Sequence, residues 1–359
     1  MKKKFLVPSI TIACMILAVV LAKFDILNNY MQTIIMTICI NIIMASSLNI
    51  VNGYMGEFSC GHAGFMAVGA YVSSVLSLIL FCPNNSITHF ALLPPESAVF
   101  LFPVVILIGG LVSMAAGLIV AIPSFKTRDD YLAIITIAAN YIIMTALNNI
   151  PGVGASRGLM GMKNTTSAMS SVLSLPWVFI WSMIFAALTV LMIHRLMSST
   201  LGKGISAIRY DEISAEIMSV NTNRMKLIAF TFSSGLAGIA GGLFAHELGF
   251  INPASFNILK STESLVMVYL GGMGSLSGSV LSAVLFTGLL ELLRPAQILK
   301  WVIIPLMLIL IMQFRPEGIM GTRELTEVFP KLRNLFTDRI LLHAPEKRSE
   351  EKSVDGGTE

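Results

Sequence analysis

Residues 202–226 read GKGISAIRYDEISAEIMSVNTNRMK and lie between two long apolar segments, residues 177–196 and 227–246. A compact, charged, helix-forming stretch between apolar segments of this length suggests a surface on which a soluble partner docks. The basic residues in and just before it indicate the cytoplasmic side of a membrane under the positive-inside rule. They are Arg195, Lys203, Arg209, Arg224 and Lys226. An ordinary solvated loop is the alternative interpretation, and these residues alone leave it open.

Three acidic residues crowd together in the middle of this stretch: Asp211, Glu212 and Glu216. Glu212 and Glu216 are spaced i,i+4, and like charges at that spacing destabilise an isolated helix by about 0.2–0.5 kcal/mol. A cationic groove on a partner would reverse this cost. Ile213 and Ile217 form an apolar stripe beside the acidic residues, and small neighbours permit close approach of a partner's backbone. The small residues are Ser214, Ala215 and Ser219. We therefore expect a short docking helix here.

The composition predicts an all-α integral membrane protein. The chain has 359 residues, of which 55% are hydrophobic and 12% charged, with a mean hydropathy of +0.79. A soluble domain carries about 25% charged residues. The net charge of +4 needs no nucleic-acid partner, because cytoplasmic loops of membrane proteins are enriched in Lys and Arg. The four cysteines are scattered singly and suggest neither a disulfide framework nor a metal site.

The apolar runs are near or above the length of about 20 residues that spans a bilayer. They are residues 5–22, 31–51, 62–81, 98–122, 131–148, 177–196, 227–246, 264–293 and 300–314. The first run follows MKKK and has two interpretations, a cleavable signal peptide or a retained membrane helix. The retained helix is favoured, because the run is longer than the apolar core of a signal peptide and the next run follows closely.

Basic residues place both termini on the cytoplasmic side, together with the loops at residues 123–130 and 202–226. Seven crossings then leave residues 249–263 outside, and a cytoplasmic tail requires an odd number of further crossings. A break in the run 264–293, at the sequence GGMGSLSG of residues 271–278, provides that number. This arrangement has ten membrane segments, and eight crossings with a re-entrant piece is the alternative.

A second glycine-rich interruption, GYMGEFSCGHAG, occupies residues 53–64. Paired glycine-broken segments in the two halves of a transporter indicate an internal repeat around a central path. The candidate path residues are Gly56, Ser59, Gly61, His62, Gly271, Gly272, Gly274 and Ser275. Other glycines serve close packing between membrane helices. We assign that role to Gly235, Gly238, Gly241 and Gly242.

The energy source is predicted to lie on another subunit. No Asp, Glu, Lys or Arg falls in the middle of a predicted span, whereas ion-coupled carriers rely on such residues. The sequence has no phosphate-binding G-x-x-x-x-G-K-[ST] motif and no catalytic grouping, so we expect neither an enzyme nor a cofactor. The path is expected to hold small neutral residues and no tight substrate site.

Four stretches resemble one family, and a fifth, DDYLAIITIA at residues 129–138, is also similar. The four are residues 202–245, NGYMGEFSCGHAGFMAVGAY (52–71), MVYLGGMGSLSGSVLSA (267–283) and FRPEGIMG (314–321). The chain resembles the LivM-type permease subunits of ABC importers for branched-chain amino acids, with a type II-like permease fold. The resemblance implies four kinds of partner: a second related permease subunit, two cytoplasmic ATPase subunits, an extracytoplasmic binding protein and the bilayer. In the family's coupling loop, Ser214 and Ser219 stand here where an alanine and a glycine are usual.

The resemblance predicts import of leucine, isoleucine and valine across a bacterial or archaeal cytoplasmic membrane. Residues 1–321 would form the permease domain, and residues 322–359 a polar cytoplasmic tail with a disordered end. Two alternatives remain. One is a permease of the same superfamily for simple sugars, urea or short amides. The other is a secondary carrier that needs no ATPase.

Overall fold

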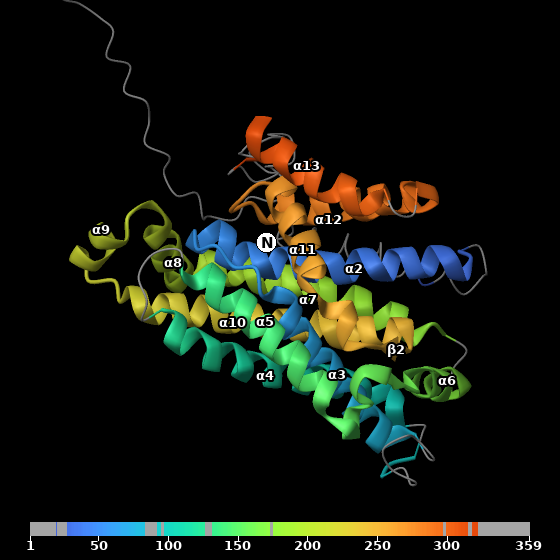
Figure 1. The fold of residues 1–359 in the computed structure, drawn as a ribbon. Helices are drawn as coiled ribbons and strands as arrows, with labels where there is room; N and C mark the ends of the chain where they lie inside the picture. The colour runs from blue at the N-terminus through green and yellow to red at the C-terminus, as the bar shows by residue number, and fades with distance from the viewer. Residues whose placement is uncertain are drawn as a thin grey trace, which may run out of the picture.

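The computed structural model describes most of the central part of the chain (Figure 1). The described residues are residue 19 and residues 27–82, 92–94, 97–125, 131–172, 175–296, 299–314 and 318–321. Apart from residue 19, the expected first apolar segment and the expected polar tail lie outside this range.

Six of the described helices are long and apolar enough to cross a membrane, which confirms the predicted all-α membrane class. Each covers one of the predicted apolar runs. They are α2 (Asn29–Asn49, continued by the π-helix η1, Ile50–Met55), α3 (His62–Phe81), α4 (Ala98–Ser124), α5 (Tyr131–Asn149), α7 (Trp177–Ser198) and α10 (Thr222–Leu248).

Three shorter helices cover the last two apolar runs. They are α11 (Ile258–Gly271), α12 (Leu276–Leu292) and α13 (Lys300–Phe314), with the 3-10 turn η6 (Arg294–Ala296) before α13. Whether these three complete a total of eight to ten membrane segments stays a prediction.

Helix α10 lies among α2, α3 and α4 and packs on all three. Its glycines permit the close contacts: a Cβ atom at Gly238 would overlap Ser113 of α4, and one at Gly241 would overlap the Met66 carbonyl of α3. Small residues that let backbones approach are the usual basis of helix association in membranes. The packing role predicted for these two glycines is confirmed.

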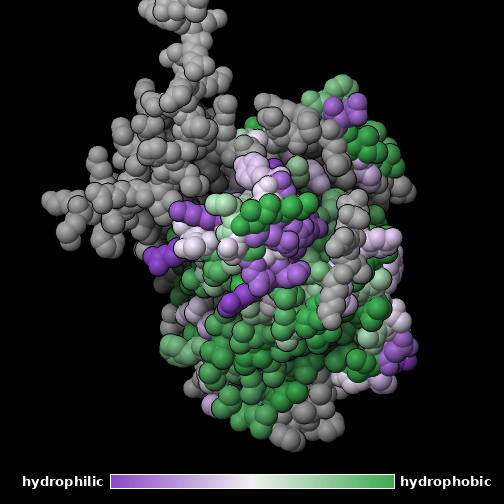
Figure 2. All heavy atoms as spheres, turned by 90° about the vertical axis from the view of Figure 1, so that its left-hand side faces the viewer, coloured by the Kyte–Doolittle hydropathy of each residue, from purple (hydrophilic) through white to green (hydrophobic). Residues whose placement is uncertain are grey.

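The two ends of the bundle differ (Figure 1). At one end, which we call the loop end, α7 leads into two short helices, α8 (Thr200–Tyr210) and α9 (Glu212–Ile217). Figure 2 views this end and shows hydrophilic residues gathered in its middle, above a hydrophobic region. The opposite end carries α6 and two short antiparallel strands. Its elements are η3 (Pro151–Val153), η4 (Ala155–Arg157), β1 (Leu159–Met160), α6 (Met162–Val172), β2 (Phe250–Ile251) and η5 (Pro253–Phe256).

The break predicted within residues 271–278 is confirmed, because α11 ends at Gly271 and α12 begins at Leu276. Gly272 and Gly274 in this break have φ angles of 112° and 84°. Such angles are accessible to glycine at little cost. The break therefore depends on glycines at these two positions.

Residues 318–321 close the end of α11. The N–H of Ile319 donates to the Leu270 carbonyl at 2.8 Å, and the N–H of Met320 donates to the Gly271 carbonyl at 3.1 Å. A helix end leaves its last carbonyls without intrahelical partners, and within a bilayer these must be satisfied by the protein. The last four residues of the FRPEGIMG stretch therefore serve as a cap for the end of α11 at this break.

Helix α12 runs antiparallel to α2. Near the loop end, Asn49 Nδ2 donates to Ser279 Oγ at 2.8 Å, and further along, Asn41 Nδ2 donates to Thr287 Oγ1 at 2.9 Å. The order is reversed between the two helices, so the chain after Leu292 emerges at the end opposite α8 and α9 (Figure 1). This agrees with the topology deduced from the charges.

Asn49 joins the two glycine-broken segments. Its Nδ2 also donates to the Ser275 carbonyl at 2.9 Å, and its Oδ1 accepts the N–H of Gly274 at 3.0 Å. Gly53, one turn further along, has no room for a side chain, since a Cβ atom would overlap Asn49. One buried amide therefore satisfies backbone groups that the break in the other segment leaves open.

Replacing Asn49 by alanine is predicted to destabilise the protein by about 2 kcal/mol, because interhelical hydrogen bonds in membranes average about 0.6 kcal/mol and three are lost. Asn41→Ala is the matched control on the same helix and loses one such bond, so its expected cost is about 0.6 kcal/mol. Chemical unfolding in detergent measures both. Equal losses for the two variants would contradict the assignment.

Candidate functional site

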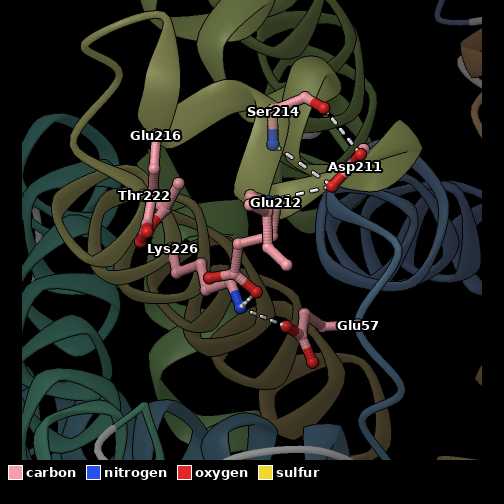
Figure 3. Close-up of polar contacts among 8 residues, drawn as sticks. Glu57, Asp211, Glu212, Ser214, Glu216, Thr222 and Lys226 are labelled. Carbon is pink, nitrogen blue, oxygen red and sulfur yellow. Dashed lines mark hydrogen bonds and ion pairs between the residues drawn. The ribbon is translucent and has the colours of Figure 1, made fainter.

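The local sequence builds α9 from a capped turn at its start. Asp211 is the N-cap, and its Oδ1 accepts the N–H groups of Ile213 at 3.0 Å and Ser214 at 3.2 Å (Figure 3). The Ser214 hydroxyl donates to Oδ2 at 2.6 Å. This hydroxyl, followed by the backbone N–H groups, lowers the pKa of Asp211. The carboxylate form is therefore favoured in the folded state, and the cap is lost only in acid.

The end of α9 is a Schellman motif. The N–H of Val220 donates to the Ala215 carbonyl at 3.1 Å, and the N–H of Ser219 donates to the Glu216 carbonyl at 2.9 Å. Ser219 has a φ of 63°, in the left-handed region that favours glycine. The serine at this position thus keeps the backbone geometry at a cost in strain.

Both acidic side chains of α9 have partners within the chain, and for Glu212 the partner is a cation. Glu212 Oε2 lies 2.8 Å from Lys226 Nζ, and Glu216 Oε1 accepts a hydrogen bond from Thr222 Oγ1 at 2.8 Å (Figure 3). Both partners belong to the first turns of α10. Lys226 thus supplies a cation to Glu212 from within the chain, while a cationic groove on a partner that meets Glu216 stays a prediction.

Lys226 also reaches the first glycine-broken segment. Its Nζ lies 2.7 Å from Glu57 Oε1, and its side chain is 10% exposed (Figure 3). A nearly buried ammonium between two carboxylates is a stable arrangement only while both carboxylates stay in place. Lys226 therefore links α9, α10 and the loop that precedes α3.

Arg209 of α8 contacts both glycine-broken segments. Its Nη1 donates to the Met273 carbonyl at 3.3 Å, in the break between α11 and α12. Its side chain also lies over Gly56, where a Cβ atom would be 3.0 Å from Arg209 Cγ. A movement of α8 would consequently change the contacts of Arg209 with both glycine-broken segments.

The outward face of α9 is apolar. The side chains of Ile213 and Ile217 are 71% and 77% exposed, and the adjacent Tyr210 and Met218 are also exposed. Ala215, in contrast, is 5% exposed and faces its own chain. The interpretation that a small Ala215 makes room for a partner is therefore wrong, since a larger residue there would first disturb the packing of α9.

The candidate path residues lie mostly inside the chain. Ser59, Gly61, His62, Gly271, Gly272 and Ser275 are buried, Gly274 is half-buried and Gly56 is exposed. A Cβ atom at Gly61 would overlap the Thr136 carbonyl of α5, and one at Gly271 would overlap the Gly278 carbonyl. Their contacts are those of helix packing. Arg209 brings Gly56 and Gly274 together, but a path lining remains a prediction for the whole set.

Three residues that connect α8 and α9 to the glycine-broken segments were not identified as site residues from the sequence. In the sequence, Glu57 is only a charged residue within a glycine-rich motif. Arg209 and Lys226 indicate only which side of the membrane their loop faces. No local spacing connects residues 57 and 226, because their pairing depends on how α3 and α10 pack.

Ser219→Gly is predicted to stabilise the end of α9 by about 0.5–1 kcal/mol, since glycine adopts a left-handed φ without steric strain. Hydrogen–deuterium exchange of α9 amides measures this directly, with an expected slowing of about two- to fivefold. The control is Ser219→Ala, which keeps a Cβ atom and is expected to give no slowing. Unchanged exchange in the glycine variant would contradict the strain assignment.

Comparison with known proteins identifies the family. The family described as "Branched-chain amino acid transport system / permease component" matches residues 30–312. The chain is 32% identical over 305 residues to the high-affinity branched-chain amino acid transport system permease protein LivM of Salmonella typhimurium, with 78% of this chain and 68% of that protein covered. LivM of Escherichia coli is 30% identical with the same coverage, 78% and 68%.

The high-affinity branched-chain amino acid transport system permease protein LivH of Salmonella typhimurium is 24% identical over 301 residues, with 80% of this chain and 92% of that protein covered. No solved structure shows significant similarity to the chain. The family match extends over all six membrane-length helices and both glycine-broken segments described above. This chain therefore belongs to the family of permease components of branched-chain amino acid transport systems.

Proposed function

We propose that this permease subunit carries leucine, isoleucine and valine into a bacterial or archaeal cell, with ATP hydrolysed on separate subunits. The family and the relatives, named as branched-chain amino acid permeases, support the substrate class. The exposed apolar face of α9 is the observation that supports a docked motor. A permease for sugars, urea or short amides has no comparable support among these relatives.

The loop end faces the cytoplasm in this proposal. Its elements carry Lys203, Arg209, Arg224 and Lys226, in keeping with the positive-inside rule. The opposite end, with α6 and the strands β1 and β2, would then receive the extracytoplasmic binding protein. Both termini would lie inside the cell.

The cytoplasmic ATPase subunits dock on α9 in this account. Ile213 and Ile217 offer an apolar anchor, which is the type of contact that carries binding energy at interfaces. The caps at Asp211 and Ser219 hold that anchor in a fixed shape. A preorganised surface of this kind loses less conformational entropy on docking than a mobile loop.

Coupling follows from the two basic residues behind the docking helix. A displacement of α8 and α9 would act through Lys226 on Glu57 and through Arg209 on the Met273 carbonyl. Both contacts lie at glycine-broken segments, where the backbone changes direction. A second, related permease subunit would complete the path, and two ATPase subunits would serve the pair.

Uptake measured in proteoliposomes tests the proposal. The complex that co-purifies with the tagged chain is reconstituted with its binding protein, and radioactive leucine uptake is followed with and without ATP on the loop-end side. ATP-dependent uptake is the expected result. Uptake that an imposed ion gradient drives without ATP would instead support a secondary carrier.

The docking contact itself is tested by the double variant Ile213→Ser/Ile217→Ser. We expect at least a tenfold loss of co-purified ATPase subunits, because the variant removes two apolar anchors of roughly 1.5 kcal/mol or more each. The matched control is Met160→Ser/Leu248→Ser, which changes exposed apolar residues at the opposite end. Equal recovery of ATPase subunits with both variants would refute docking on α9.

A further inference from the structure

Charged residues lie inside the helical bundle where the sequence predicted an external loop. Residues 249–263 were assigned outside the membrane, but α11 begins at Ile258 and includes Lys260 and Glu263. Lys260 Nζ lies 2.9 Å from Glu263 Oε2, and the two side chains are only 18% and 14% exposed. Ser261 between them is buried, and its Oγ accepts the N–H of Ala63 from α3. The start of α11 is therefore part of the packed bundle.

A second carboxylate approaches this pair from α10. Glu247 lies one turn after Phe244, and Lys260 Nζ is 5.5 Å from the centroid of the Phe244 ring. The charges of Glu247 and Lys260 interact. From α2, Thr37 Oγ1 donates to Glu247 Oε1 at 2.7 Å. The group thus joins α2, α10 and α11 on the side away from the loop end.

One carboxylate oxygen of Glu247 can accept a further hydrogen bond. Its Oε2 is buried and has no hydrogen-bond partner among the residues that the structure describes. A buried carboxylate oxygen without a donor is costly, and a charged N–H group is the donor that compensates it best. The group thus offers one open acceptor oxygen, on Glu247, near an ammonium that is already paired with Glu263.

We propose that Glu247 and Lys260 form a transient binding site for α-amino acid zwitterions on their way through the permease. Glu247 Oε2 accepts the substrate ammonium, and the Lys260 ammonium, which has three N–H donors, shares one with the substrate carboxylate. The Phe244 ring, which lies under the Lys260 ammonium and packs against Phe256, contributes to the apolar surroundings of the site. The inference rests on the proposed function and replaces the expectation of a path lined only by neutral residues.

The site is transient because its ammonium, on Lys260, already has a partner in Glu263. A substrate carboxylate must compete with Glu263 for Lys260. The net binding free energy is therefore only the difference between the free energies of the substrate–Lys260 and Glu263–Lys260 ion pairs. Weak binding suits a permease that passes its substrate on. Selection for a group with both an ammonium and a carboxylate follows from the opposite signs of Glu247 and Lys260.

Protection of a reporter thiol tests the site in the full complex. The native cysteines are replaced, and Thr37→Cys places a thiol beside Glu247. We expect leucine to slow its modification by a small maleimide severalfold. The carboxylate-only analogue 4-methylpentanoate and the amine-only analogue 3-methylbutylamine are expected to protect little. Adding Glu247→Gln or Lys260→Met is expected to abolish protection by leucine, whereas Glu291→Gln, which alters the exposed pair of Glu291 and Arg294, keeps it.

Leucine uptake by the wild-type complex distinguishes a failure of the zwitterion site from a failure of the proposed transport function. Uptake without any protection of the reporter thiol overturns this site and leaves the proposed function standing. Equal protection by leucine and by either analogue also overturns it, since a zwitterion site requires both charges. Protection without uptake supports the site and contradicts the proposed function.

Discussion

Backbone groups at two breaks in the helical bundle must be satisfied inside the protein, and this constraint organises the loop end of the structure. Water is absent from the core of a bilayer, so each open N–H or carbonyl costs several kcal/mol. Asn49, at the end of α2 just before the first break, bonds to Gly274 and Ser275 in the second. Residues 318–321 satisfy the carbonyls at the end of α11. The breaks are therefore held in one geometry, with unusual backbone angles that their glycines adopt at little cost.

The short helices α8 and α9 are joined to these breaks by two cations. Lys226 contacts Glu57 and Glu212, and Arg209 contacts the Met273 carbonyl. Truncating one member of a nearly buried ion pair is costly, because it leaves the other charge without compensation. A docking surface that is capped at both ends and joined through Lys226 and Arg209 to the two breaks is suited to pass a displacement inwards. We therefore regard the group Glu57, Glu212 and Lys226 as the central link of the proposed coupling mechanism.

Much of the fold follows from local sequence, because a membrane span is recorded in its own composition and length. The six long helices and the break at residues 271–278 were predicted in this way. The start of α9 is also encoded locally, since aspartate is a typical N-cap residue and Asp211 occupies that position. Contacts between residues far apart in the sequence could not be predicted. No sequence pattern around Lys226 indicates that it pairs with Glu57, and the burial of Ala215 depends on how α8 and α10 pack against α9. The pairing of Lys260 with Glu263 was also missed, because hydropathy alone treats these residues as part of a loop, whereas the structure places them in α11 as an ion pair.

A double-mutant cycle on the Glu57–Lys226 pair tests the central claim most directly. Glu57→Gln, Lys226→Met and the double variant are reconstituted in the full complex, and leucine molecules transported per ATP hydrolysed are counted. If this pair transmits the displacement, each single variant lowers the ratio and the double variant lowers it little further, with a coupling energy of about 1 kcal/mol or more. Losses that simply add, or ratios equal to that of the wild type, would contradict the claim that Lys226 links the docking helix to the glycine-broken segment.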